Sequence, residues 1–188
     1  MHPVDALVGA LEAQVAVGLR LQPSQLLLDS PCPGWSVRDV LNHSIGTTSK
    51  FTDFAAGRTE HPRSPDGDLV GPDHRAALGR TVNTARAAWR SADMTRSCDL
   101  SFGTFSADHA AGINLFDVAA HTWDIAVATG TRFECPDDIW DAALDAARSV
   151  IGPDRDARHY APAIACSLTA PVRDRFLAYL GRDPHETP

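Results

Sequence analysis

The spacing of hydrophobic side chains predicts a chain that is helical over most of its length. Apolar residues recur at intervals of three and four, which places them on one face of a helix. Capping signals bound several of these series: Ser36 and Asp39 form a capping-box pair at one start, and Gly57 and Gly130 follow two ends. The expected helices cover residues 4–21, 36–56, 74–93, 108–128, 135–152 and 170–181.

The segments between these helices carry turn and loop signals. Residues 57–73 are polar and interrupted by Pro and Gly, and residues 152–169 are irregular and rich in Pro, so we expect two surface loops that shape a pocket mouth. The stretch CDLSFGTF alternates around Gly103 and predicts a short extended or hairpin segment. Four main helices with two appended ones favour an all-α four-helix bundle, a single domain over residues 1–188.

Composition and charge narrow the choice of partners. The chain has 188 residues, of which 44% are hydrophobic and 22% charged, with a formal net charge of −7. No basic cluster offers a track for phosphates, so nucleic acid is excluded as an expected partner. No apolar run approaches the ~18 residues of a membrane span, and the N-terminus lacks a signal-peptide pattern, so we expect a cytoplasmic protein that binds small molecules. The oligomeric state is left open, a homodimer included.

The stretch NLFDVAAHTWDIAVATG, residues 114–130, is the most informative helix. Its polar residues Asn114, Asp117, His121 and Asp124 are spaced by three, four and three, so they form one narrow stripe on an otherwise apolar surface. The stripe contains no Lys, Arg or Glu, the residues typical of a solvated face. A solvent-facing stripe and an inward-facing site are both compatible with this pattern, but Asp117 and His121 have the i, i+4 spacing of metal ligands.

His43 lies at the edge of the apolar face of the helix over residues 36–56, in the row of Val40, Thr47 and Phe54. It can therefore point inward. One interpretation is a hydrogen-bonded histidine at the border of the core, and the other is a ligand that faces the polar stripe.

The four cysteines are widely separated and form neither a C-x-x-C pair nor a zinc-ribbon spacing. We interpret them as small, partly buried thiols in a reducing compartment. Cys32 differs from the others because it precedes a helix whose N-terminal dipole would lower the pKa of its thiol. The cysteines are Cys32, Cys98, Cys135 and Cys166.

Two segments resemble the signature stretches of a known family. CPGWSVRDVLNH at 32–43 and FDVAAHTWDIAVATG at 116–130 are similar to those of the DinB-like, mycothiol-dependent maleylpyruvate isomerases of actinobacteria. The ending DRFLAYLGRDP resembles that of the family's short metal-binding members. The resemblance implies a DinB-like bundle in which three side chains bind one divalent ion and leave a coordination position open. These are His43, Asp117 and His121, with Asn114 and Asp124 supporting the ligands or lining the pocket.

The resemblance favours a metal-dependent transferase or isomerase that uses mycothiol, or a related thiol, on a small electrophile. Zinc is the first choice of metal, although nickel and other ions accept the same ligands. The isomerases differ in having Glu at the position of Asp117 and an additional C-terminal domain. A non-catalytic metal-binding or small-molecule-binding module is the alternative, followed by a metal-dependent hydrolase. The sequence identifies no catalytic residue beyond the ligands and no residue that binds the thiol.

Overall fold

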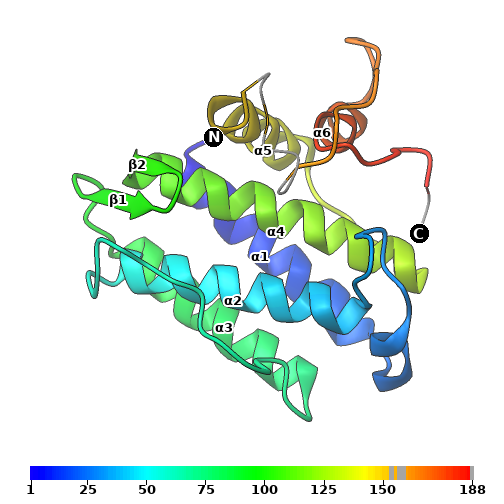
Figure 1. Ribbon diagram of the computed structural model, residues 1–188, viewed down its shortest axis with the longest axis horizontal. Coiled ribbons are helices and arrows are strands. Elements are labelled where there is room, and N and C mark those ends of the chain that lie inside the picture. The colour runs from blue at the N-terminus through cyan, green and yellow to red at the C-terminus, as the bar shows by residue number, and fades with distance from the viewer. Residues whose placement is uncertain (153–154, 156–159, 187–188) are drawn as a thin grey trace.

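Six α-helices and one β-hairpin make up the described part of the chain, residues 1–152, 155 and 160–186 of a computed structural model (Figure 1). This confirms the predicted all-α bundle with additional short helices and a hairpin. The elements are α1 (Pro3–Arg20), the 3-10 helix η1 (Pro23–Leu27), α2 (Val37–Ala55), α3 (His74–Arg90), β1 (Ser97–Leu100), β2 (Gly103–Ser106), α4 (Ala107–Thr129), α5 (Asp137–Val150) and α6 (Val172–Tyr179).

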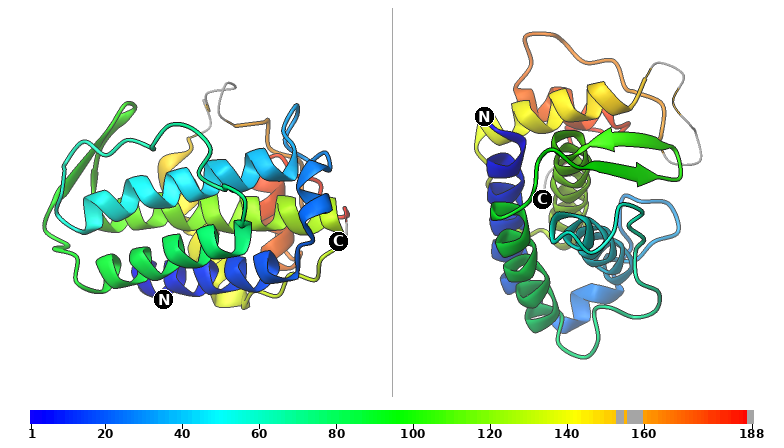
Figure 2. Two further views of the ribbon diagram at one scale, coloured as in Figure 1. Left: turned by 90° about the horizontal axis from the view of Figure 1, so that it is seen from below. Right: turned by 90° about the vertical axis from the view of Figure 1, so that its left-hand side faces the viewer.

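The first four α-helices form the bundle, and the last two cover one side of it. α4 packs against α1 and α2, and α3 packs against the same two helices from the other side. α5 lies over α1 and α4, while α6 packs on α5 (Figure 2). α4 is therefore surrounded by α1, α2 and α5.

This central position explains why α4 is apolar on nearly every face. Most of its side chains are buried, including the polar residues Asn114, Thr122 and Asp124, each with no exposed surface. Ser106 caps the start of the helix by accepting a hydrogen bond from the His109 N–H, and Gly130 ends it in the left-handed conformation with φ 62°. A carboxylate that is fully buried requires a partner of opposite charge, so Asp124 must be paired with a cation in the folded protein.

The helix boundaries differ from the predicted ones by a few residues, mainly at prolines and glycines. α6 is shorter than the predicted segment 170–181, because Pro171 stands at its N-cap and Gly181 follows its C-cap. The sequence did not predict η1, where Pro23 begins a single short turn. The hairpin pairs Ser97 with Ser106 and leads directly into α4. Within the described residues, no helix has the length and apolar character that a membrane span needs.

Candidate metal centre

The three side chains of the predicted metal site converge between α2 and α4. Nε2 of His43 lies 3.1 Å from Oδ1 of Asp117, and Nε2 of His121 lies 3.7 Å from the same oxygen. One ligand atom from each residue lies within 4.8 Å of the others. Neighbouring ligand atoms in a tetrahedral zinc site are about 3.3–3.6 Å apart when the bonds are about 2.0–2.2 Å long. The observed spacing therefore suits a divalent ion with small adjustments.

Local helix geometry brings these residues together. α2 starts with a capping box in which the Asp39 N–H donates to Ser36 Oγ and the Ser36 N–H donates to Asp39 Oδ2. His43 follows Asp39 by one turn and faces α4, on which Asp117 and His121 share one side at i and i+4. Because α2 packs on α4, the imidazole from one helix meets the carboxylate and the imidazole of the other.

Asp117 is the electrostatic centre of this group. Burial raises its pKa, but the neighbouring His43 and His121 outweigh this effect and hold the pKa below its ordinary value of 3.8. For His43, burial lowers the pKa, but the charge of Asp117 and the hydrogen bond to it raise the pKa above 6.5. Asp117 Oδ2 is buried and has no hydrogen-bond partner among the described residues. A carboxylate oxygen left in this state between two imidazoles fits the place of a metal ligand.

Asp124 supports the site from the other side of His121. Its Oδ2 accepts a hydrogen bond of 2.8 Å from His121 Nδ1. Burial raises the pKa of Asp124, but the Arg182 guanidinium and the His121 hydrogen bond hold it well below its ordinary value. An ionised carboxylate only accepts hydrogen bonds, so the proton of the His121 ring is on Nδ1. In the neutral ring, Nε2 then carries the lone pair that a metal ion would bind.

Arg182 is the partner that the buried Asp124 requires, and the sequence analysis did not identify it. Its Nε donates to Oδ1 at 2.8 Å and its Nη2 donates to Oδ2 at 2.7 Å, a two-pronged pair between residues 58 positions apart. The glycine signal at the end of the last helix was visible in the sequence. No local pattern connects that helix end to α4, so the pairing could not be deduced.

Cys32 lies beside Asp124, and the expectation of a lowered thiol pKa was wrong. The thiol donates a hydrogen bond of 3.2 Å to Asp124 Oδ2, and Sγ lies 3.9 Å from His121 Nδ1. Burial and the nearby negative charge of Asp124 raise the pKa of Cys32 to about 12, despite the opposing influence of Arg182. These effects outweigh the helix dipole on which the expectation rested. All four cysteines are free thiols.

Asn114 lies further along the same stripe and contacts α2. Its side-chain oxygen accepts a hydrogen bond of 3.5 Å from Thr48 Oγ1, and its amide nitrogen is buried with no partner in the described part of the chain. No hydrogen bond among the described residues connects it to His43, Asp117 or His121. Asn114 thus contributes to the contact between the two helices.

Two aromatic side chains flank the ligand atoms. The Trp35 ring lies 5.2 Å from the His43 ring and 6.3 Å from the His121 ring, between centroids, and 37% of this tryptophan is exposed. Tyr160 lies near enough to Asp117 that burial, together with the charge of this carboxylate, raises the pKa of the phenol to about 12. Neither residue was singled out in the sequence, although Trp35 belongs to the CPGW turn before α2.

The two loops expected at the pocket mouth differ in how far they are described. The loop over 57–73 packs along α2, where the Leu69 N–H donates to Asn42 Oδ1 at 2.7 Å and Asn42 Nδ2 donates to the Gly67 carbonyl. In the loop over 152–169, residues 153–154 and 156–159 lie outside the described residues. The role of both loops at the pocket mouth stays a prediction.

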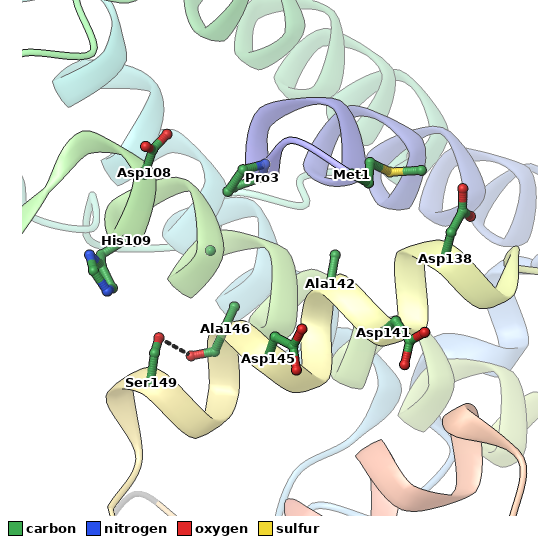
Figure 3. Close-up of a pocket in the computed structure, with 11 residues that line it drawn as sticks. Met1, Pro3, Asp108, His109, Asp138, Asp141, Ala142, Asp145, Ala146 and Ser149 are labelled. Atoms are coloured by element: carbon green, nitrogen blue, oxygen red, sulfur yellow. Dashed lines mark hydrogen bonds between the residues drawn. The ribbon is translucent and has the colours of Figure 1, made fainter.

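A surface pocket of about 550 Å³ lies away from these residues, between the N-terminus, the start of α4 and one side of α5 (Figure 3). Four aspartates are among the residues that line it, and His109 lies at one end. Among the residues that the structure describes, none of the pocket's side chains belongs to a group with metal-ligand spacing. The acidic residues are Asp108, Asp138, Asp141 and Asp145.

The sequence of this chain is similar to those of known proteins over much of its length. Residues 7–126 match a family model described as the mycothiol maleylpyruvate isomerase N-terminal domain. The uncharacterized protein Rv0738 of Mycobacterium tuberculosis (strain ATCC 25618 / H37Rv) is 28% identical over 184 residues, which cover 97% of this chain and 98% of the relative. The uncharacterized protein MT0763 of strain CDC 1551 / Oshkosh has the same identity and coverage. No solved structure matches the chain.

Proposed function

Because the chain belongs to the mycothiol maleylpyruvate isomerase N-terminal domain family, we propose that it binds one divalent metal ion and uses it to engage a low-molecular-weight thiol such as mycothiol. The ligands are His43, Asp117 and His121. The observation that carries the proposal is the convergence of their ligand atoms around an Asp117 oxygen that is buried without a hydrogen-bond partner. Imidazole and carboxylate ligands suit zinc, the first choice, and also nickel.

The chain's own residues prepare this site for a thiol. Three protein ligands leave one position of a tetrahedral site for an incoming group, whereas a site of four protein ligands would be closed. Trp35 supplies a partly exposed apolar ring beside both imidazoles, against which the body of a ligand can pack. A divalent ion held there would lower the thiol pKa from about 8.5, so that a thiolate forms near neutral pH.

The reaction class that we propose is transfer or isomerisation of a small electrophile. In both cases the thiolate sulfur supplies the electron pair for a new bond to an electrophilic carbon, and another bond at that carbon breaks. In a transferase a leaving group departs with the electron pair of its bond, or the π pair of a C=C bond moves toward a conjugated carbonyl and the product is protonated, so that the C–S bond is kept. In an isomerase the π pair moves toward the carbonyl, rotation occurs about the single bond that remains, and return of the pair restores the C=C bond and expels the thiolate. The family membership supports the thiol, and the ligand set supports the ion.

Metal analysis tests the first half of the proposal. Protein purified without a histidine tag should contain one divalent ion per chain, and His121→Ala should contain none because a ligand is removed. His109→Ala is the matched control, since His109 lies on the same helix but is exposed and hydrogen-bonds Ser106. Full metal occupancy in His121→Ala would refute the assignment.

Cobalt substitution tests the second half. Mycothiol added to the Co(II) protein should produce a sulfur-to-metal charge-transfer band near neutral pH, together with release of about one proton per thiol bound. Cys32→Ala should give the same band, which would show that the sulfur comes from the added thiol. Mycothiol that fails to bind, or binds without the band, would favour a non-catalytic binding module. Hydrolysis of an ester or amide without any thiol would favour a metal-dependent hydrolase instead.

A further inference from the structure

The last helix of the chain ends in a motif that fixes the backbone of Arg182. The N–H of Gly181 donates to the Ala178 carbonyl at 3.0 Å, and the N–H of Arg182 donates to the Leu177 carbonyl at 2.9 Å. With Gly181 at φ 78°, these two hydrogen bonds form a Schellman motif. A Cβ at Gly181 would lie 2.6 Å from the Ala161 Cβ, so glycine is required here on two grounds.

From this fixed position the Arg182 side chain reaches α4. Its guanidinium contacts both oxygens of Asp124 at 2.7 and 2.8 Å, and Nη1 donates to the Leu180 carbonyl at 3.3 Å. The Asp124 side chain is completely buried, and 19% of the Arg182 side chain is exposed. A planar guanidinium that holds both carboxylate oxygens fixes the orientation of the carboxylate as well as its position.

The orientation of Asp124 in turn determines that of the His121 ring. Oδ2 of Asp124 accepts hydrogen bonds from Arg182 Nη2 at 2.7 Å and His121 Nδ1 at 2.8 Å, and a longer one from the Cys32 thiol at 3.2 Å. Oδ1 accepts only the Arg182 Nε hydrogen bond among those found in the described residues. Without Arg182 this oxygen would lose its partner in a buried setting, and the carboxylate would be free to rotate away from the imidazole.

We infer that Arg182 is a positioning residue of the metal centre, which acts through Asp124 to hold the His121 ring with Nε2 facing His43 and Asp117. The inference rests on the proposed function, because it assigns Arg182 a role in preparing the proposed ligand set. Hydrogen-bonded partners of ligating histidines commonly fix both the tautomer and the ring orientation. Here that partner is fixed by a residue outside the segment 7–126 that matches the family model.

Metal affinity measured against a chromophoric chelator tests the inference. Arg182→Gln removes the charge and the two-pronged contact, and should weaken zinc and cobalt binding by about 100-fold. Arg182→Lys keeps the charge but offers no planar fork, and should weaken binding by about 10-fold; both losses lie in the range known for such outer partners. Arg173→Gln is the matched control, because Arg173 is an exposed residue of α6 that pairs with its neighbour Asp174. It should bind metal as the wild type does.

The His121 tautomer gives a readout that needs no metal. Two-bond ¹H–¹⁵N correlation spectra of the metal-free wild type should show His121 protonated on Nδ1. Arg182→Gln should show a mixture of the two tautomers, whereas Arg173→Gln should match the wild type. A change confined to general stability would leave the tautomer unaltered in the folded fraction. If Arg182→Gln does not fold, the same two measurements on Arg182→Lys decide, since that variant keeps the positive charge beside Asp124.

The possible outcomes distinguish a missing role for Arg182 from a failure of the proposed function. If the wild type binds metal while Arg182→Gln and Arg182→Lys bind it equally well with an unchanged tautomer, Arg182 has no positioning role and the inference is overturned. If the wild type itself binds neither zinc nor cobalt, the proposed function is refuted, and so is the inference that rests on it. Weakened binding in both variants with normal binding in Arg173→Gln supports the inference.

Discussion

Replacing Asp117 by asparagine should abolish metal binding while leaving the metal-free protein almost as stable as before. The change preserves the size of the side chain and an oxygen that can accept the His43 hydrogen bond, now at 3.1 Å. A charge-assisted hydrogen bond contributes about 1.5–3 kcal/mol and a neutral one about 0.5–1.5 kcal/mol. The loss is thus about 1 kcal/mol, and removal of a buried charge offsets part of it.

The difference between the two proteins should appear only when metal is present. At free zinc about 100 times the dissociation constant, binding stabilises the wild type by about 2.7 kcal/mol. For a chain of 188 residues this corresponds to a rise in the melting temperature of about 5–10 °C. Asp117→Asn should show no rise at the same zinc concentration, because an amide is a far weaker ligand than a carboxylate.

Thermal melts followed by circular dichroism, with zinc and with a chelator, measure both quantities. Asp108→Asn is the matched control, since Asp108 lies on the same helix with 55% of its side chain exposed and outside the ligand group. It should retain the full zinc-dependent rise. An equal rise in Asp117→Asn would refute the ligand assignment. A loss of more than about 3 kcal/mol in its metal-free form would instead show that Asp117 serves the fold.

Three further predictions concern the surroundings of the site. Ser36→Ala should cost about 1 kcal/mol at neutral pH by removing the cap of α2. Because the Ser36 hydrogen bond holds the pKa of Asp39 below 3.8, this stabilisation is present above about pH 4 and declines below it. In urea denaturation, the difference in stability between the variant and the wild type should therefore shrink in acid. Trp35→Phe should remove most of the fluorescence quenching caused by Co(II), since the Trp35 ring lies 5.2 Å from that of His43, and quenching that persists unchanged would place the ion elsewhere. Leu115→Ala should destabilise the protein by about 2–5 kcal/mol in chemical denaturation, because this leucine is fully buried on α4, and a cost below about 1 kcal/mol would contradict the central position of that helix.

Helix periodicity was sufficient to predict the bundle, and the family resemblance added the expectation that His43 meets Asp117 and His121. The spacing of Asp117 and His121 is local, and the apolar row that contains His43 indicates which side of its helix packs inward. The narrow polar stripe proved to lie within the protein, because Asn114 and Asp117 face α2 and Arg182 covers Asp124. The sequence alone left open whether the stripe faces solvent or the interior.

Contacts between distant segments could not be predicted in the same way. Arg182 meets Asp124 only because the chain returns to α4 through α5 and α6, and no periodicity encodes that path. The wrong expectation of a lowered pKa for the Cys32 thiol has a related cause. The dipole of the following helix is a local property, whereas the burial and the Asp124 charge that raise its pKa arise from the tertiary structure.

The burial of most of the α4 surface also restricts how the chain can change in length. Each residue inserted into an α-helix turns everything after it by about 100°. One residue added ahead of Leu115 would rotate that side chain out of the core and turn Asp117 away from α2 in the same step. The hairpin turn at Ser101 and Phe102 is exposed and carries no such coupling, so it can absorb an insertion. Insertions are thus confined to the connections between helices, and the helix that carries Asp117 and His121 has a fixed length.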